Sequence, residues 1–276
     1  MIAESEGRDA AERFRKEYRL GSQPLGDLVT LIEQTVGADV AVLDTGVDQH
    51  GMTMRRGDHG TVYIAVARTP NPMRQRSTLA HELAHVVFDD WADQPQLDSA
   101  SPTESRANAF ARHLLLPLQS VEDLTAAESG HDHLAMLSKI VQRFQVSPAI
   151  AAIALEQVGY ISTADKALFM SETTPRLAVR FGWSDQYQAM QRESNQRRAP
   201  QRLLARAISG YLQNAVSIRT IATLRGLDAA VVEKELSDAG LTPAELVPAW
   251  VEPGDLPDVD VDLTELDADL GDSGIE

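Results

Sequence analysis

The chain of 276 residues contains no cysteine, which excludes disulfide bonds and metal sites built from thiolates. It also has no apolar run of about 18 residues, the length that a membrane-spanning helix needs. The first residues, Met-Ile-Ala-Glu-Ser-Glu-Gly-Arg-Asp, lack the charged and then apolar pattern of a signal peptide. We therefore expect a cytoplasmic protein with no membrane contact.

Basic residues are absent from the C-terminal end of the chain. Residues 252–276 contain ten Asp or Glu and no Lys or Arg. Subtracting these ten charges from the formal net charge of −16 leaves −6 for residues 1–251, so the rest of the chain is only mildly acidic. We expect residues 251–276 to form an acidic disordered tail. Such a tail either improves solubility or acts as a docking or inhibitory segment.

Residues 78–88, Thr-Leu-Ala-His-Glu-Leu-Ala-His-Val-Val-Phe, contain the pattern His-Glu-x-x-His, which is typical of zinc peptidases. On a helix, His81 and His85 lie one turn apart on one face, where two imidazoles can bind the same Zn²⁺. Glu82 can then act as the general base toward water. The flanking residues are apolar, so the helix should be buried, and unpaired polar groups in a core cost several kcal/mol. The alternative is a pair of hydrogen-bonded core histidines.

A third ligand is predicted on a helix at 103–115, which Ser101-Pro102-Thr103 can start and Pro117 can end. Its narrow face of small residues carries one carboxylate: Glu104, Ala107, Asn108 and Ala111. Glu104 can complete a site of two histidines and one glutamate with an open position for water. Alternatively, Glu104 is a solvated acid in a first helical turn. His113 follows nine residues later, about 180° around the helix, and should not serve the same metal.

These motifs resemble the ImmA/IrrE family of zinc metalloendopeptidases over residues 8–160. The resemblance rests on Arg76-Ser-Thr-Leu-Ala-His-Glu-Leu-Ala-His85, Glu104-x-x-Ala-Asn-x-Phe-Ala-x-x-Leu-Leu-Leu-Pro117, Pro24-Leu-Gly-Asp-Leu28 and Val146-Ser-Pro-Ala. One departure is Ser77, where the family usually carries Phe. The resemblance implies that His81, His85 and Glu104 bind zinc and that Glu82 is the catalytic glutamate. It also implies a substrate related to helix-turn-helix repressors in bacterial mobile-element or DNA-damage responses.

Three further residues are candidates to contact the ligands or the substrate: Asn108, Arg76 and Tyr63. His131 and His133 flank a predicted loop, where they are either solvated or near enough to stabilise an oxyanion. We expect one Zn²⁺ per chain, although another divalent metal would suit the same ligands.

Apolar periodicity and turn residues predict an α+β fold. A mostly helical, zincin-like peptidase domain over residues 1–160 should contain a small antiparallel sheet. The expected strands are 38–44, 52–56 and 61–67, the last two joined by Gly57-Asp-His-Gly60. The expected helices are 8–20, 24–36, 73–89, 103–115, 118–128, 133–145 and 147–158. The strand Thr61–Val66 would offer a free edge to an extended substrate, or would be purely structural.

Residues 161–199 are expected to connect this domain to a small all-helical unit at 200–250, with helices at 201–213, 217–225 and 229–239. Ala222, Gly226 and Val232 have the spacing of a helix-turn-helix core. Seven arginines between residues 192 and 225 would suit phosphates, but the predicted recognition helix 229–239 is net acidic. The unit is therefore predicted to contact a protein, and DNA binding is the less favoured alternative.

The sequence favours a zinc-dependent endopeptidase that cleaves a regulatory protein, such as a helix-turn-helix repressor, in a bacterial or mobile-element stress response. The alternatives are a non-proteolytic binding module and a DNA-binding regulator, each with a structural metal site. Glu82 argues against the binding module, because a structural metal site needs no general base.

Overall fold

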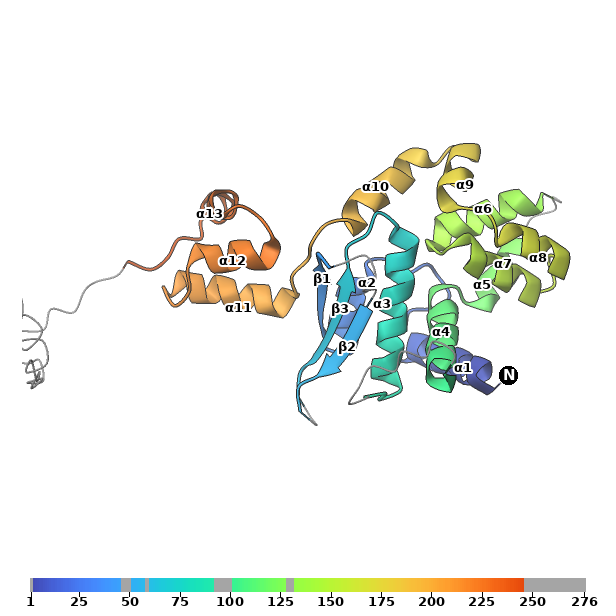
Figure 1. Ribbon diagram of the computed structural model, residues 1–276, viewed down its shortest axis with the longest axis horizontal. Helices are drawn as coiled ribbons and strands as arrows, with labels where there is room; N and C mark the ends of the chain where they lie inside the picture. The colour runs from blue at the N-terminus through green and yellow to red at the C-terminus, as the bar shows by residue number, and fades with distance from the viewer. Residues whose placement is uncertain (1, 46–50, 58–59, 92–100, 128–131, 246–276) are drawn as a thin grey trace, which may run out of the picture.

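The computed structural model describes residues 2–45, 51–57, 60–91, 101–127 and 132–245. These residues form a mostly helical α+β fold around one small sheet, as the sequence predicts (Figure 1). Among the described helices, none combines the length and the apolar character that crossing a membrane requires.

The sheet consists of β1 (Asp39–Leu43), β2 (Gly51–Arg55) and β3 (Val62–Ala67), in the order β1-β3-β2. β2 and β3 form the predicted antiparallel hairpin, in which Thr53 lies opposite Ile64. β1 and β3 are parallel, with Val40 opposite Ile64, so the prediction of an antiparallel sheet is wrong for this pair. The alternation of apolar residues specifies which face of a strand is buried, but it does not specify the direction of the neighbouring strand.

The two edges of the sheet differ. β3 is central, so the prediction that Thr61–Val66 offers a free edge is wrong. The outer edge of β1 is paired with the backbone of Arg198, through hydrogen bonds of 2.9 and 3.0 Å with Val42. Within the part of the chain that the structure describes, β2 has no strand partner on its outer edge.

Two helices cover the buried face of the sheet, α2 (Leu28–Thr35) and α3 (Pro72–Val87). This face carries the buried side chains of Val40, Val42, Ile64 and Val66. α3 begins where Asn71 caps it by accepting a hydrogen bond from the Arg74 amide, with Pro72 in the first turn. The sheet thus sets the position of the helix that carries the His-Glu-x-x-His pattern.

α4 (Pro102–Leu115) lies between α3 and α1 (Ile2–Glu17) and packs on both (Figure 1). It starts as predicted, with Ser101 as the cap that accepts from the Glu104 amide. The crossing with α1 is close at Gly7, where an added Cβ would lie 2.5 Å from the Cβ of Ala109. Glycine is therefore required there for the two backbones to approach.

The following helices are α5 (Leu118–Ala126), α6 (His133–Phe144), α7 (Pro148–Gln157), α8 (Thr163–Phe169), α9 (Thr174–Arg180) and α10 (Ser184–Ser194). The segment 161–199, expected as a connection, thus folds into three helices. It buries Leu177, Ala178, Trp183 and Tyr187 in the main hydrophobic core. The Trp183 indole also donates to the Ser138 hydroxyl at 3.0 Å, which fastens this segment to α6.

The last helices are α11 (Gln201–Leu212), α12 (Ile218–Arg225) and α13 (Ala229–Asp238). They enclose a separate small core: Ala207, Ile221, Ala222, Val232 and Leu236. Gly226 ends α12 in the left-handed conformation, with φ of 65°, as a turn glycine would. Polar contacts hold the start of this unit to the sheet, including an ion pair of 2.9 Å between Arg202 and Asp39.

Candidate active site

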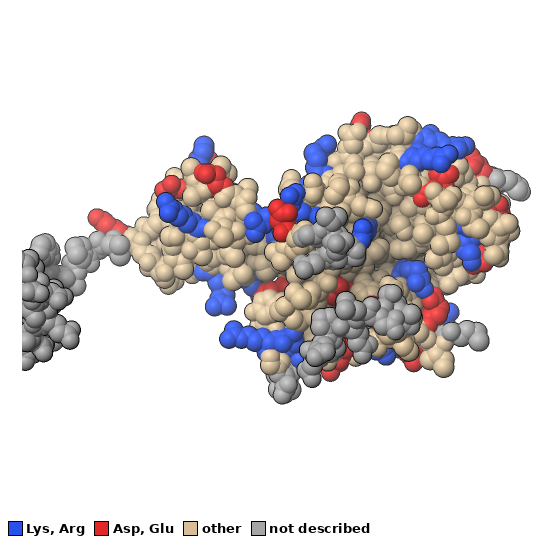
Figure 2. All heavy atoms as spheres, in the orientation of Figure 1, with Lys and Arg blue, Asp and Glu red and all other residues tan. Residues whose placement is uncertain are grey.

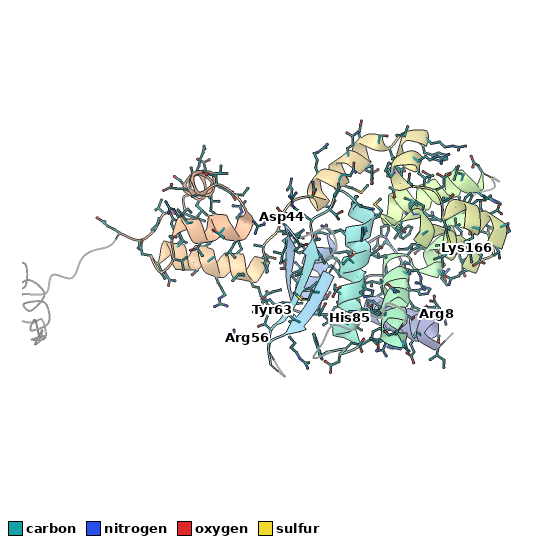
Figure 3. All side chains as sticks on the ribbon, in the orientation of Figure 1. Arg8, Asp44, Arg56, Tyr63, His85 and Lys166 are labelled. Atoms are coloured by element: carbon teal, nitrogen blue, oxygen red, sulfur yellow. The ribbon has the colours of Figure 1, made fainter. Side chains whose placement is uncertain are left out.

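α3 brings two imidazoles to one point on its surface. His81 and His85 lie one turn apart, and their Nε2 atoms are 3.1 Å from each other. Both side chains are partly exposed, whereas Glu82 between them is 7% exposed and faces the sheet. Figure 3 shows His85 on α3, beside the sheet that carries Tyr63. α3 thus places His81 and His85 where solvent can reach them and places Glu82 on its largely buried side.

Glu104 joins these histidines from the first turn of α4. Its Oε2 lies 3.0 Å from Nε2 of His81, and its Oε1 lies 3.6 Å from Nε2 of His85. Two ligands at about 2.0–2.1 Å from a tetrahedral zinc ion stand about 3.3 Å apart. Each imidazole nitrogen therefore lies near one oxygen of Glu104, and one ligand atom from each of the three residues lies within 4.8 Å of the other two. The donor set of two imidazoles and a carboxylate suits such an ion.

The other nitrogen of each imidazole has an oxygen partner. Nδ1 of His81 lies at a hydrogen-bond distance of 3.0 Å from Oδ1 of Asn108. Nδ1 of His85 lies 3.6 Å from Oδ2 of Asp90, which is longer than a hydrogen bond but close enough for attraction between the two groups. Both partners are acceptors, so they favour the tautomer with a proton on Nδ1 and a free lone pair on Nε2. Both histidines are thereby prepared to bind a metal through Nε2, and the prediction that Asn108 contacts a ligand agrees with this geometry.

Asp90 reaches His85 because of the way α3 ends. Asp89 adopts a left-handed conformation with φ of 56°, its amide donates to the Val86 carbonyl, and the Asp90 amide donates to the His85 carbonyl. This pair of hydrogen bonds is the Schellman motif, which folds the chain back onto the last helical turn. Arg106 of α4 holds Oδ1 of Asp90 at 2.7 Å. Oδ2 is left facing the histidine.

Glu82 is held from the side of the sheet. The Thr53 hydroxyl lies 2.7 Å from Oε2 of Glu82 and 3.2 Å from the Glu82 carbonyl. Gly51 lies beside the other oxygen, because a Cβ on this residue would be 2.5 Å from Oε1. Burial raises the pKa of Glu82 and the Glu104 carboxylate raises it further, against the opposing effects of Thr53 and His81. A raised pKa makes the carboxylate a stronger base.

Two of the predicted contact residues lie elsewhere. Arg76 donates to the carbonyls of Leu25 and Gly26 at 2.8 and 2.7 Å, and burial lowers its pKa to about 10. It fastens the segment before α2 to α3 and contacts no ligand. Tyr63 lies opposite Met54 in the hairpin, on the sheet face away from Glu82. Since side chains alternate along a strand, Tyr63 cannot share the face of Thr53 and Ile64.

Among the other histidines, the structure describes only His113 and His133, and neither joins the candidate ligands. His113 lies 2.9 Å from Glu4, on the α1 side of α4, in agreement with the expectation that it serves no common metal with Glu104. The His133 ring packs against Tyr160, with ring centroids 5.1 Å apart. His131 lies outside the described residues. An oxyanion-stabilising role for either His131 or His133 therefore has no support in the described geometry.

Sequence reasoning missed Gly51, Thr53 and Asp90. No local pattern points to Gly51 or Thr53, because the pairing of β2 with β3 is what brings them to α3. Asp90 had a weak signal, since an acid in the turn directly after a metal-binding helix can fold back to a histidine.

Residues 37–156 match the family model of the IrrE N-terminal-like domain, which defines the metallopeptidase family M78. No curated protein matches the chain. The matched region contains the whole sheet, α3 and α4, and with them Glu82 and all three candidate ligands. The resemblance found in the sequence is thereby confirmed. Residues 37–156 are thus similar to the peptidase domain of the IrrE N-terminal-like family, and this match covers less than half of the chain.

Proposed function

We propose that the protein is a zinc-dependent endopeptidase in which His81, His85 and Glu104 hold the metal and Glu82 is the general base. The observation that carries this proposal is the convergence of two imidazole nitrogens, 3.1 Å apart, with the Glu104 carboxylate, whose Oε2 and Oε1 lie 3.0 and 3.6 Å from them, next to a largely buried glutamate. A purely structural site would need the three ligands but not Glu82.

The residues divide the chemistry between them. A zinc ion in this site would supply Lewis-acid polarisation of a carbonyl and would acidify a water molecule. Oε1 of Glu82 takes the proton of the attacking water, since Oε2 is occupied by the Thr53 hydroxyl. The same carboxyl group then delivers the proton to the nitrogen of the leaving amine. Asn108 beside Nδ1 of His81 and Asp90 beside Nδ1 of His85 favour metal binding through Nε2 of each ring.

The peptide is proposed to bind along β2. This strand has a free outer edge among the described strands, and it lies directly beside Glu82. An extended peptide can add to such an edge through backbone hydrogen bonds. The edge of β1 is closed by Arg198, so pairing there would first require that this contact open. The strand with the free edge is thus the strand that contacts the proposed general base.

The substrate is proposed to be a regulatory protein, such as a helix-turn-helix repressor, within a bacterial or mobile-element stress response.

The α11–α13 unit is proposed to contact protein and not DNA. Three of the seven arginines between residues 192 and 225 pair with acids: Arg198, Arg202 and Arg225. On the side of this unit that Figure 2 shows, acidic and basic side chains lie side by side and form no continuous basic patch. A reader of the DNA major groove needs such a patch.

Glu82→Gln is the direct test of the mechanism. The amide keeps the shape of the side chain but cannot accept a proton, so the variant should retain about one equivalent of metal and lose peptide cleavage by a factor of about 100 or more. His81→Ala, the control for the metal, should lose both. Metal content is measured by mass spectrometry, and cleavage is measured on candidate repressors and on an unstructured protein. Undiminished cleavage by Glu82→Gln would disprove the mechanism.

A companion experiment separates the peptidase from a binding module with a structural metal. If the metal is catalytic, a chelator should abolish cleavage while the protein stays folded by circular dichroism. If the metal is structural, the chelator should unfold the domain.

A further inference from the structure

The side of Glu82 that faces the sheet is built from one strand. β2 contributes Thr53, whose hydroxyl lies 2.7 Å from Oε2, and Gly51, whose backbone lies against Oε1. Neither residue belongs to the His-Glu-x-x-His pattern or contacts a metal ligand. The largely buried carboxylate therefore takes its orientation from a strand that is distant in sequence from α3.

Thr53 fixes one carboxylate oxygen in two ways. The hydroxyl also lies 3.2 Å from the Glu82 carbonyl, so one group links the backbone and the side chain of the same residue. The pairing of Thr53 with Ile64 fixes the hydroxyl in turn, because Ile64 is fully buried in the face that packs on α3. With Oε2 accepting from the Thr53 hydroxyl, Oε1 is the oxygen that this hydrogen bond leaves open.

Gly51 restricts the same carboxylate by close approach. A Cβ at this position would lie 2.5 Å from Oε1 of Glu82 and 2.6 Å from Cγ2 of Thr78. Contacts of this length do not occur between real atoms, so any larger residue must move Glu82 or separate β2 from α3. A glycine here lets β2 lie close enough for the Thr53 hydroxyl to reach the carboxylate.

We propose that Thr53 and Gly51 are positioning residues, which hold Glu82 with Oε1 directed toward the reacting water. This inference rests on the proposed peptidase function for the role of Glu82. It adds that β2 serves twice, as the edge that binds the peptide and as the support of the general base. Peptide pairing with β2 would then stabilise the strand on which the alignment of Glu82 depends.

The test compares Thr53→Val with Thr53→Ser. Valine has the shape of threonine without its hydroxyl, whereas serine keeps the hydroxyl. Thr53→Val should lower kcat about 10-fold or more with little change in KM, since misplacement of a catalytic group slows the chemical step more than binding. Thr53→Ser should recover most of kcat. Thr125→Val is the matched control, because it makes the same change in α5, outside the candidate site, where the hydroxyl donates to the Val121 carbonyl at 2.9 Å.

Two measurements do not depend on activity. Metal content should stay at the wild-type level in both Thr53 variants, because no ligand contacts this residue. In a crystal structure of Thr53→Val, the Glu82 carboxylate should leave its place beside β2. Gly51→Ala is a second, independent variant that should displace Glu82 and lower kcat with metal retained.

The outcomes separate this inference from the proposed function. If the wild type cleaves and Thr53→Val cleaves at the same rate with Glu82 unmoved, the positioning role is overturned and the peptidase stands. If the wild type binds metal but cleaves nothing, the proposed function fails, and the position of Glu82 in the variant still decides whether Thr53 and Gly51 hold it. A fall in kcat that Thr53→Ser does not recover would also overturn the role of the hydroxyl.

Discussion

At the scale of single residues, the candidate site depends on hydrogen-bond partners as much as on ligands. Asp90→Asn tests this for His85. The amide can still accept from Arg106 through its oxygen, but its NH₂ group then faces Nδ1 of His85, which is forced to accept. The proton moves to Nε2, the atom that should bind the metal. Metal affinity should fall about 10- to 100-fold, measured by competition with a chelator.

The control for this change is Asp89→Asn. Asp89 is exposed and pairs with Arg55, and asparagine tolerates its left-handed conformation. This neighbouring substitution should leave metal affinity unchanged. Equal losses in both variants would mean that Asp90 acts only through the fold of the turn after α3.

The candidate ligands could be predicted from the sequence, whereas most of the residues beside them could not. His81, Glu82 and His85 follow from a spacing of four on one helix, and Glu104 follows from a small-residue face on the next. Such patterns are local. Thr53 reaches Glu82 only through the register of β2 against β3, and the sequence does not encode that register in any short motif. Tyr63 failed as a candidate for the same reason, since its face depends on that register.

At the scale of elements, helices were predicted more successfully than strand pairing. α4 starts at Pro102 after a serine cap and ends before Pro117, both of which are visible in the sequence. The three strands were found by alternation, but the parallel pairing of β1 with β3 depends on how the chain crosses the sheet. The helices α8 and α9 were not predicted, and residues 184–200 were interpreted as a linker or an exposed helix, because few apolar residues of this polar segment are buried.

The crossing of α1 and α4 gives a prediction about one element. In a helix interior, Gly→Ala normally stabilises by about 1 kcal/mol. In Gly7→Ala the added methyl would lie 2.5 Å from the Cβ of Ala109 and 2.7 Å from the carbonyl oxygen of Arg106. The variant should therefore lose about 1–3 kcal/mol of unfolding free energy in urea denaturation. Because α4 carries Glu104, metal affinity should fall as well.

The matched control is Gly210→Ala in α11. There the nearest atom to the new methyl would be a Val216 methyl at 3.3 Å, a flexible neighbour that can yield. This change should be close to neutral in stability and should not affect metal binding. If Gly7→Ala were as harmless as Gly210→Ala, the close approach of α1 and α4 would be of no importance to the site.

At the scale of the whole molecule, the described chain has two hydrophobic cores of unequal size. The larger core contains the sheet and α1 to α10, and the smaller one lies within α11 to α13. A three-helix unit with so few buried side chains is marginally stable alone. Its link to the sheet is polar: Arg198 pairs with Asp27 at 2.6 Å, and Arg202 pairs with Asp39. We therefore propose that the two parts unfold separately, with only the larger one coupled to the metal.

Metal removal tests this division. A ligand stabilises only the unit that binds it, by about 4 kcal/mol at a concentration 1,000-fold above its Kd. Removal of zinc by a chelator should therefore accelerate hydrogen exchange in α3 and α4, which carry the three ligands, and leave exchange in α11–α13 unchanged. Arg202→Ala should weaken the attachment of α11–α13 to the sheet without affecting the metal site. It removes the ion pair with Asp39 and the hydrogen bond to the Gly37 carbonyl. It should increase exchange near residue 201 while the metal stays bound. If metal removal reduced protection from hydrogen exchange in both α3 and α13, the two cores would unfold as one unit. Metal binding would then also stabilise the helices that are proposed to contact a partner protein.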